Sequence, residues 1–475
     1  MRNQSKKQEI KNKEVFWTEE YNPRLKAYDY KIDAPALRVY LKNEGYRLFK
    51  NEPIKLTGRV ASKVTADDIF NYTLRYVETF EDKNLEASFI KMGEALLLRN
   101  KAIIISLQEC EFRPLKDSEF ISYKFYDGAI LKVEKNKAFE ILKYEEIDGF
   151  IWQETIIKRK FKVLEEKFIE DAIFAKFIKN ISNNEDHFNS ICSAVGYLLH
   201  NYKDQRKPVA IIVNDQNLID DGKPQGGTGK GLLIKGLSKI VEKALYNGKN
   251  ADFTNNKFAY QNVSETSNIL FIDDAPRNFN FEALFSVLTE DMPIERKHQP
   301  VLALPYKESP KFVITTNYTI KGTSSSFKRR RFDVFLNNYY NASHTPADDF
   351  GNEFFHGWDE EEWYYFDFFM MCCLRLYLSM GFIKYNDPEW ELKILKNETS
   401  PDFIDFMESN YAEKNVYNSF VSIRDKMIAI YGEKYMFLKR DVKTMIEWVE
   451  LYANYKGLKV LRGPRTSEGF TFCFN

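Results

Sequence analysis

The sequence predicts an α/β fold built around a parallel sheet. A glycine-rich run at residues 224–231 lies between an apolar stretch at 209–213 and a helical pattern of apolar residues that begins at Leu232. Further apolar stretches at 268–272 and 311–316 are each followed by polar side chains. Short, continuously apolar runs are typical of strands buried on both faces of a parallel sheet. A strand, a tight connection and a helix in succession form the repeating unit of such folds.

The glycine-rich run has the pattern of a phosphate-binding loop. Its glycines allow successive backbone N–H groups to point at one anion, and its lysine adds a positive charge for the outer phosphates. The helix that follows directs the positive end of its dipole at the same place. The residues predicted to bind a nucleotide are Gly226, Gly227, Thr228, Gly229, Lys230 and Gly231.

The loop departs from the full pattern in three ways. Pro224 stands where the first glycine is expected, and Gly231 stands where a Ser or Thr hydroxyl would face magnesium. The connection from the strand is also long, and it carries Asp215, Asp220 and Asp221. Taken alone, the run could therefore be an ordinary glycine-rich turn.

Polar side chains follow the next two predicted strands. Asp273 and Asp274 come at the end of the first, and Asn317 comes at the end of the second. Ligands bind at the carboxyl ends of strands in open α/β sheets. One carboxylate could hold magnesium while the other orients the attacking water, and the amide could bind the γ-phosphate or that water. An Asp-Asp pair is also a common way to end a strand in a turn.

A basic cluster at residues 328–331 follows these strands. Such clusters are usually solvated surface patches. After a phosphate loop and an acid pair, the cluster also fits an arginine finger that acts across a subunit interface, with Arg329 and Arg330 as the candidates.

In this order and at these spacings, the four motifs resemble those of the superfamily 3 helicases. These are hexameric AAA+ motors of viruses, plasmids and other mobile elements, and this chain most resembles the phage and poxvirus-type primase-helicases. The resemblance covers about residues 105–380. It implies an AAA+ P-loop ATPase core that uses ATP and Mg²⁺ and forms a homo-hexamer. The catalytic residues that it implies are Lys230, Asp273, Asp274, Asn317 and either Arg329 or Arg330, with the metal at Asp273 and Asp274.

The resemblance also implies a DNA-gripping hairpin in the central pore, between the acid strand and the sensor strand. Residues 294–300 take that place here, and Lys297 and Lys307 are the candidate DNA contacts. Gly231 departs from the family pattern, which puts the strength of ATP hydrolysis in doubt more than nucleotide binding itself. Residues 123–131 are similar to the β-rich segment that precedes the motor in the poxvirus-type family, although a plain hairpin explains them equally well.

Composition sets limits on the classes of function. The chain has 475 residues with 69 basic and 69 acidic side chains, so nucleic-acid binding has to come from local patches rather than overall charge. Five scattered cysteines indicate a reduced, cytoplasmic protein without a zinc site. The lysine-rich N-terminus has no signal-peptide pattern and no run is apolar enough to span a membrane, so no membrane partner is expected.

The chain is expected to contain several parts. They are a disordered tail (1–14), an N-terminal α+β accessory domain (15–164), a helical collar (165–202), the ATPase motor (203–345), a helical extension (346–399) and a winged-helix-like C-terminal domain (400–475). The collar would either hold the hexamer together or simply pack on the motor. In the accessory domain, residues 66–77 predict a helix, and residues 102–107 and 129–133 predict strands.

The end of the chain predicts a helix through 439–452 and a strand pair at 458–462 and 469–474 around a turn at 463–466. This pattern resembles a winged-helix module, which binds duplex DNA or a partner protein, although a small α+β cap is an alternative. The basic residues that would contact phosphates are Lys439, Arg440, Lys443, Arg462 and Arg465.

The function expected from the sequence is an ATP-dependent, ring-forming replicative DNA helicase of a phage or mobile element that translocates on single-stranded DNA. No carboxylate cluster suited to primer synthesis is visible beyond the motor acids, so any primase is expected to be a separate chain. One alternative is a nucleotide-dependent origin-binding or assembly protein with weak or no ATP turnover. Another is an NTPase for DNA packaging or remodelling.

Overall fold

The computed structural model describes residues 14–24, 27–216, 227–250, 256–297, 300–320, 322, 325–351, 354–411, 413–440, 442–467 and 469–475. The predicted tail at 1–14 therefore lies outside the described residues except for Glu14. The chain divides into two compact units. The first contains residues 1–116, 123–132 and 139–161, and the second contains 117–122, 133–138 and 162–475.

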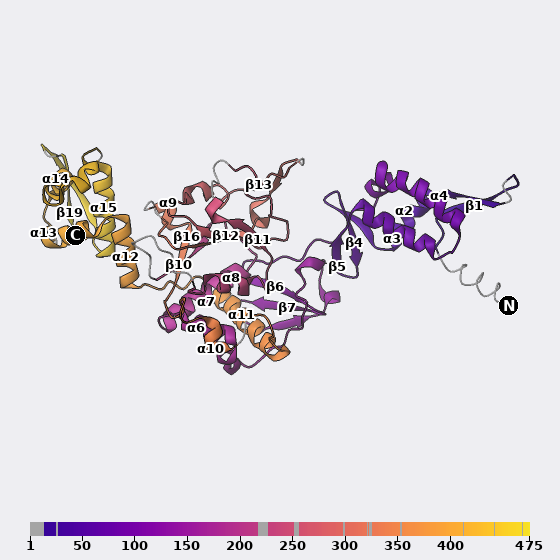
Figure 1. Cartoon of the computed structure of the whole chain (residues 1–475), viewed down its shortest axis with the longest axis horizontal. Coiled ribbons are helices and arrows are strands. Elements are labelled where there is room, and N and C mark those ends of the chain that lie inside the picture. The colour runs from indigo at the N-terminus through magenta and orange to yellow at the C-terminus, as the bar shows by residue number, and fades with distance from the viewer. Residues whose placement is uncertain are drawn as a thin grey trace. The chain divides into compact units, whose positions relative to one another are not determined.

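The first unit combines small, mostly antiparallel sheets with short helices (Figure 1). Its strands are β1 (Trp17–Asn22) paired with β2 (Ala27–Ile32), and β3 (Tyr46–Phe49), β4 (Glu52–Thr57) and β5 (Val60–Lys63) in one sheet with β9 (Ile151–Trp152), which pairs parallel with β5. Its helices are α2 (Ala34–Asn43), α3 (Ala66–Glu78), α4 (Lys83–Gly93), a π-helical turn η1 (Glu94–Arg99) and α5 (Ala102–Ile105). A further sheet contains β6 (Ile121–Tyr126), β7 (Ala129–Glu134) and β8 (Glu140–Leu142).

Two of the three predictions for this region are confirmed. The helix at 66–77 is α3, which begins with a capping box between Thr65 and Asp68, and the strand at 129–133 is β7. The predicted strand at 102–107 is wrong, because α5 occupies its place. Ile103 and Ile104 are buried there in the core shared by the neighbouring helices. A short apolar run does not distinguish a buried strand from a buried helical turn.

The second unit contains a five-stranded parallel sheet, which confirms the predicted α/β class (Figure 1). Its strands, in spatial order, are β11 (Lys243–Asn247), β12 (Ile269–Ala275), β15 (Lys311–Thr316), β10 (Ala210–Asp215) and β16 (Arg331–Leu336). All neighbouring strands run parallel, so their carboxyl ends meet at one edge of the sheet. The three strands predicted from the apolar runs are β10, β12 and β15.

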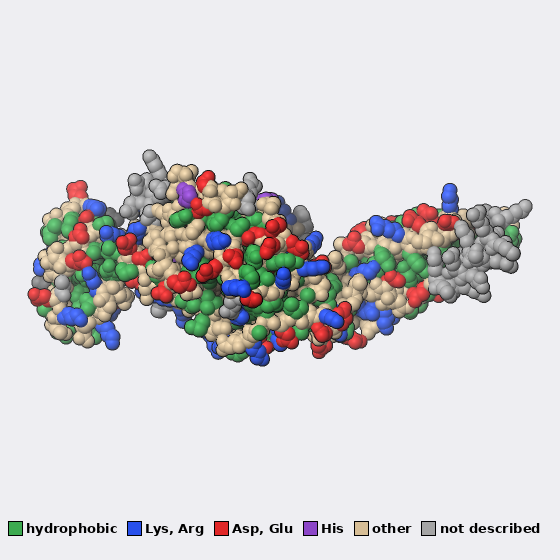
Figure 2. Space-filling model, turned by 90° about the horizontal axis from the view of Figure 1, so that it is seen from below, with side chains coloured by type: hydrophobic (Ala, Val, Ile, Leu, Met, Phe, Trp, Pro, Cys, Tyr) green, Lys and Arg blue, Asp and Glu red, His purple; other side chains and the backbone are tan. Residues whose placement is uncertain are grey.

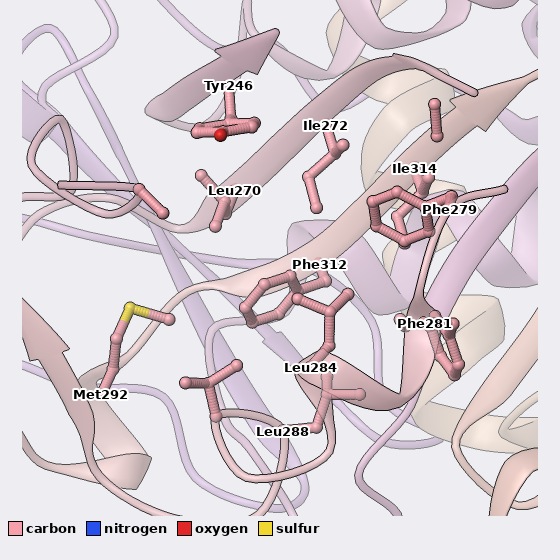
Figure 3. Packing of buried hydrophobic residues seen from close by; sticks show 14 of the residues in the cluster. Tyr246, Leu270, Ile272, Phe279, Phe281, Leu284, Leu288, Met292, Phe312 and Ile314 are labelled. Atoms are coloured by element: carbon pink, nitrogen blue, oxygen red, sulfur yellow. The ribbon is translucent and has the colours of Figure 1, made fainter. Parts of the chain in front are cut away.

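The sheet packs on a large hydrophobic core. Leu270 and Ile272 of β12 lie beside Phe312 and Ile314 of β15 and face Phe279, Phe281, Leu284 and Leu288 (Figure 3). Every residue of β10 and of β15 is buried. Complete burial contributes about 1.5–3 kcal/mol for each of the large apolar side chains among them. The same core holds the hairpin of β13 (Met292–Ile294) and β14 (Leu302–Leu304) through Met292, Ile294 and Leu304.

Helices pack beside this sheet. They include α6 (Ile173–Asn180) and α7 (Glu185–Leu199), which form the helical part of the predicted collar, and α11 (Glu360–Met380). The helix α11 begins after Asp359, whose carboxylate accepts from the backbone N–H of Glu362, and it ends at Gly381, which has a positive φ of 72°. The Nζ of Lys311, at the start of β15, donates to the carbonyl oxygens of Tyr197 and His200. This side chain therefore caps the carboxyl end of α7.

The remaining described elements are mostly short. They are 3-10 helices η2 (Tyr144–Glu146), η3 (Gln153–Thr155), η4 (Glu166–Asp171), η5 (Gly248–Asn250), η6 (Phe281–Leu284) and η7 (Tyr306–Glu308), and helices α8 (Lys230–Leu237), α9 (Ser325–Lys328) and α10 (Pro346–Phe350). Among the described residues, no helix combines the length and apolar character needed to cross a bilayer.

Residues 388–475 have a hydrophobic core of their own that includes Phe403, Phe420, Trp448 and Phe472. The elements are α12 (Pro388–Glu398), α13 (Pro401–Asn410), β17 (Asn418–Ser419), α14 (Phe420–Tyr431), η8 (Gly432–Arg440), α15 (Val442–Tyr455), β18 (Val460–Thr466) and β19 (Gly469–Phe474). The three strands pair antiparallel in the order β17-β19-β18.

The predicted C-terminal strand pair is present, but the predicted turn at 463–466 is wrong because β18 continues to Thr466. The pairing with β19 is irregular between Arg462 and Arg465. Pro464 lies at that point and has no N–H to donate, so the ladder is interrupted without ending the strand.

Candidate nucleotide-binding site

A cavity of about 640 Å³ opens at the carboxyl edge of the parallel sheet. The ends of β12 and β15 contribute the acid pair and the amide of Asn317, and the glycine loop and α8 form the opposite wall. The lining residues are Gly227, Thr228, Gly229, Lys230, Gly231, Leu232, Lys235, Asp273, Asp274, Thr315, Thr316, Asn317, Thr345, Pro346, Ala347 and Phe354. Motifs that are far apart in the sequence are thus brought into one pocket.

In the described part of the glycine loop, two glycines have positive φ angles. Gly227 and Gly229 have φ angles of 111° and 102°, a region that is costly for residues with a β-carbon. Gly227 also lies close to the loop after β16, because a β-carbon there would be 3.3 Å from the carbonyl carbon of Asn341. The helix α8 begins directly after Gly229. Gly226, Asp220 and Asp221 lie outside the described residues.

Lys230 is held by groups from two strands. Its Nζ forms an ion pair with the Oδ2 of Asp215 at the end of β10 and donates to Oδ1 of Asn317 at 2.7 Å. Thr228 donates its hydroxyl to the other carboxylate oxygen of Asp215. The pair is largely buried, with side-chain exposures of 14% for Lys230 and 6% for Asp215. Sequence reasoning noted Asp215 only as part of a long connection and gave it no role.

The acid pair lies in an irregularity of the sheet. The pairing of β12 with β15 shifts register between Ile272 and Ala275, and Asp274 there has a φ of 54°. Thr315 of the neighbouring strand connects the two acids: its hydroxyl accepts from the backbone N–H of Asp274 at 3.0 Å and donates to Oδ1 of Asp273 at 2.8 Å. Such bulges redirect side chains beside functional sites. Sequence reasoning did not single out Thr315.

Lys249 lies beside the acid pair, and sequence reasoning missed it. Its Nζ lies 2.7 Å from Oδ2 of Asp274, and this hydrogen bond raises the pKa of the lysine above its ordinary value. Gly248 makes this approach possible, because a β-carbon there would lie 2.4 Å from the carbonyl oxygen of Asp273. The available signal was a Gly-Lys pair directly after an apolar strand.

The oxygen atoms of Asp273 and Asp274 suit a hard divalent cation such as Mg²⁺. The described residues contain no group of three or more His, Cys, Asp or Glu side chains that could hold a metal ion. In proteins, Mg²⁺ is usually bound by one or two carboxylates together with substrate phosphates and water. Asn317 connects this region to the loop, because its Nδ2 lies 3.5 Å from Oδ1 of Asp274.

Arg329 and Arg330, the two candidates for the arginine finger, have different environments. Arg330 donates to the carbonyl oxygen of Ser326 at 3.0 Å, and its guanidinium lies 4.6 Å from the centre of the Phe285 ring. Partial burial lowers the pKa of Arg330. Arg329 is exposed and has a long contact of 3.4 Å with the hydroxyl of Ser326. Neither is among the described residues that line the pocket of the same chain.

The candidate DNA contacts are distributed over two regions. Lys297 is exposed and follows β13. Its neighbour Arg296 donates hydrogen bonds to the carbonyl oxygens of Gln261 and Val263. Lys307 is exposed in η7, outside the hairpin. Charges of both signs are interspersed over the face seen in Figure 2, in keeping with the zero net charge. On the face seen in Figure 2, DNA binding would therefore depend on local basic groups.

The basic residues of the C-terminal region have mixed surroundings. Lys443 lies 3.9 Å from Glu447, and Arg462 lies 3.8 Å from Glu450. Arg465 lies over the ring of Phe470 at 5.3 Å. The other two predicted contacts, Lys439 and Arg440, fall in η8, where Lys439 is exposed.

The chain is similar to one protein family and, at low identity, to several solved structures. A family model described as "Family of unknown function (DUF5906)" matches residues 223–331, from the glycine loop to the arginine cluster. No curated protein matches the chain. A structure of the C-terminal region of NrS-1 (residues 305–718 of that protein) is 13% identical and covers 74% of this chain and 96% of that chain, with a TM-score of 0.31.

Two further solved structures are similar at the same low level. A second structure of the NrS-1 C-terminal region is 14% identical over 75% of this chain and 96% of that chain, with a TM-score of 0.29. A Cytophaga hutchinsonii protein provisionally described as an ATPase is 9% identical over 65% of this chain and 88% of that chain, with a TM-score of 0.23.

Proposed function

We propose that this chain is an ATP-dependent DNA helicase that forms a ring and translocates on single-stranded DNA, as part of the replication apparatus of a phage or mobile element. The observation that carries the proposal is the pocket at the carboxyl edge of the sheet. It combines a glycine loop, a lysine, two carboxylates and an amide in one cavity of about 640 Å³. These are the parts that phosphoryl transfer from a nucleoside triphosphate requires.

The proposed chemistry follows from where each group lies. Lys230 and the loop N–H groups would bind the β- and γ-phosphates, and Asp273 and Asp274 would hold the Mg²⁺ that accompanies the nucleotide. Asn317 is hydrogen-bonded to Lys230 and near Asp274, so it can orient the attacking water between the phosphate and the acids. Bound Mg²⁺ would neutralise the charge that develops on the phosphates.

Arg329 is proposed as the finger that completes the site from a neighbouring subunit. Its side chain is exposed, whereas Arg330 is engaged with Phe285 and the carbonyl oxygen of Ser326. A guanidinium supplied in trans stabilises the transition state and makes turnover depend on assembly. The ring is proposed to be a homo-hexamer of AAA+ motors, with α6 and α7 as its collar.

The β13–β14 hairpin is proposed as the element that grips DNA. It is anchored in the core by buried residues at its base, and Lys297 follows β13 on its exposed side. Hydrolysis in the pocket would move the hairpin and pull one strand. Lys307 is the second proposed phosphate contact in this region.

The C-terminal region is proposed to be a winged-helix domain. The element order α13-β17-α14-α15-β18-β19 and the sheet order β17-β19-β18 support this proposal. Lys439, Arg440, Lys443, Arg462 and Arg465 are its proposed DNA contacts. A separate primase is a proposed partner of the whole assembly.

Steady-state ATP hydrolysis with and without single-stranded DNA tests the central proposal. Turnover that rises with DNA and is lost in Lys230→Ala is the expected result, with Lys239→Ala as a control on a lysine outside the pocket lining. Unwinding of a forked duplex then separates a helicase from a packaging or remodelling NTPase. Turnover that persists in Lys230→Ala would assign the activity to a different site.

A second candidate is an origin-binding or assembly protein that binds nucleotide with weak or no turnover. Gly231 favours it, because the hydroxyl that usually faces magnesium is missing. Nucleotide-dependent ring formation in wild-type protein, without release of phosphate, is the outcome that would select this candidate over the helicase.

A further inference from the structure

Asp215 is a buried carboxylate in the pocket region that the proposed mechanism does not use. It is the last residue of β10, and 4% of its surface is exposed. Both of its oxygens are engaged, one by the Lys230 ammonium and the other by the Thr228 hydroxyl. The last residue of one strand is thereby attached to two residues of the glycine loop.

We infer that Asp215 is a positioning residue that holds the Lys230 ammonium in place and competes with the triphosphate for it. This inference rests on the proposed function of the pocket. When a nucleotide binds, the ammonium transfers part or all of its hydrogen bonding from Asp215 to an outer phosphate oxygen. Asp215 thus fixes the lysine before binding and lowers the affinity of the site for the nucleotide.

The number of N–H donors on the Lys230 ammonium supports this exchange. An ammonium group has three N–H donors, and in this structure Asp215 and Asn317 accept from Lys230. One donor remains for a phosphate, and a second becomes available if Asp215 or Asn317 releases the one that it accepts. The carboxylate and the phosphate carry like charges, so a buried Asp215 beside the same lysine disfavours anion binding.

Thr228 keeps the Asp215 carboxylate hydrogen-bonded during this exchange. Its hydroxyl continues to donate to Asp215 when the ammonium moves, so the carboxylate keeps a hydrogen-bond partner. Thr228 is itself buried and belongs to the glycine loop. The position of Lys230 and the shape of the loop are therefore coupled through one carboxylate.

The first test measures Lys230 without any nucleotide. Reductive methylation with formaldehyde and borohydride, followed by peptide mass spectrometry, reports how available each lysine amine is. Lys235 lines the same pocket and is the internal reference. In Asp215→Asn, methylation of Lys230 relative to Lys235 is expected to rise by about tenfold, because a buried ion pair has been removed.

Two variants keep this test decisive. Thr228→Val removes the other partner of Asp215 without changing the ion pair, so Lys230 is expected to stay protected. Asp215→Ser is the second neutral variant and is used if Asp215→Asn does not fold, as judged by circular dichroism. Equal methylation of Lys230 in wild-type protein and in a folded neutral variant would overturn the inference.

The second test measures binding of a non-hydrolysable ATP analogue and steady-state hydrolysis. Asp215→Asn is expected to bind the analogue about tenfold more tightly, because a like charge is removed, while kcat falls because the ammonium is less well fixed. A purely structural role would instead weaken binding and lower thermal stability together, and that result would overturn the inference.

The two tests separate the inference from the function on which it rests. If the chain binds no nucleotide while Asp215 still controls methylation of Lys230, the proposed function fails and the ion-pair role stands. If the chain binds nucleotide through Lys230 and Asp215→Asn leaves affinity and kcat unchanged, the proposed function stands and the inference fails.

Discussion

The side-chain oxygen of Asn317 accepts a hydrogen bond of 2.7 Å from the ammonium of Lys230, which joins the end of β15 to the start of α8. The amide nitrogen of the same residue faces Asp274 at 3.5 Å. One side chain therefore connects Lys230 to the acid pair, and under the proposed function it would sense whether a γ-phosphate is present.

Asn317→Ala is expected to reduce kcat for ATP hydrolysis by about 10²–10³-fold, because a group that orients charge in the transition state is removed. Binding of a non-hydrolysable analogue should change little, since the loop and Lys230 remain. Calorimetric titration together with phosphate release measures both quantities. Asn262→Ala, outside the pocket lining, is the control. An equal loss of binding and turnover would show that the amide serves binding alone.

Gly231→Ser is expected to increase turnover and to lower the Mg²⁺ concentration needed for half-maximal activity. A β-carbon at Gly231 would meet nothing within 4 Å in the described part of the chain, so the added hydroxyl has room where P-loops usually place it. Gly231→Ala adds the methyl without the hydroxyl and is the matched control. Identical Mg²⁺ titrations of the two variants would contradict this prediction.

Arg329→Ala and Arg330→Ala are expected to fail in different ways. Loss of the exposed Arg329 should abolish turnover while nucleotide still binds. Loss of Arg330 should lower thermal stability, because its contact with the Phe285 ring contributes about 0.5–2 kcal/mol. Lys328→Ala, an exposed neighbour, is the control for both.

The same variants test whether the site is shared between subunits. A mixture of Lys230→Ala and Arg329→Ala chains contains interfaces in which an intact loop meets an intact finger, so partial turnover is expected to return. Turnover is measured as phosphate release at several mixing ratios. A mixture as inactive as its components would place Arg329 outside the catalytic site.

The sequence was informative where one local signal was sufficient. The strands β10, β12 and β15 were predictable because their apolar runs are continuous and each ends at polar residues. Lys230, Asp273, Asp274 and Asn317 follow from the polar ends of those strands and from the loop, because parallel strands bring their carboxyl ends together. The structure places all four in one pocket.

The sequence was silent where a role depends on contacts between distant elements. Asp215 precedes Thr228 by 13 positions, and no local sequence pattern shows that Thr228 comes back into contact with Asp215. Thr315 looks like an ordinary strand residue until the register shift brings the acids beside it. Lys249 depends on the close passage of Gly248 past β12. The short helix α5 was mistaken for a strand because both structures bury an apolar run of that length.

Gly196→Ala is expected to destabilise the second unit by about 1–3 kcal/mol, which is the usual cost of overpacking. A β-carbon at Gly196 of α7 would lie 2.1 Å from the carbonyl oxygen of Cys373 in α11, so the helices would have to separate. Thermal unfolding measures the effect. Gly231→Ala, in open space on α8, should show no loss, and equal midpoints for the two variants would contradict the close contact.

Lys203 is expected to make stability depend on pH in the alkaline range. Its ammonium is buried, donates to the hydroxyl of Ser309 at 2.6 Å and lies over the ring of Tyr306. Burial lowers the pKa of Lys203 from 10.5 to about 7. Between these values the unfolded chain binds more protons than the folded chain, so stability rises with pH through this window and is lowest below it.

Lys203→Met is expected to remove this dependence and to stabilise the protein near pH 7. The variant has no ammonium to bury, so folding no longer includes the cost of desolvating or deprotonating it. The gain is expected to reach a few kcal/mol at most, at about 1.4 kcal/mol for each pKa unit of the shift. Urea unfolding at several pH values in the window measures it for both proteins. Lys207→Met, an exposed lysine nearby, should keep the wild-type slope. Parallel stability curves for wild-type protein and Lys203→Met would show that Lys203 remains charged in the folded state throughout.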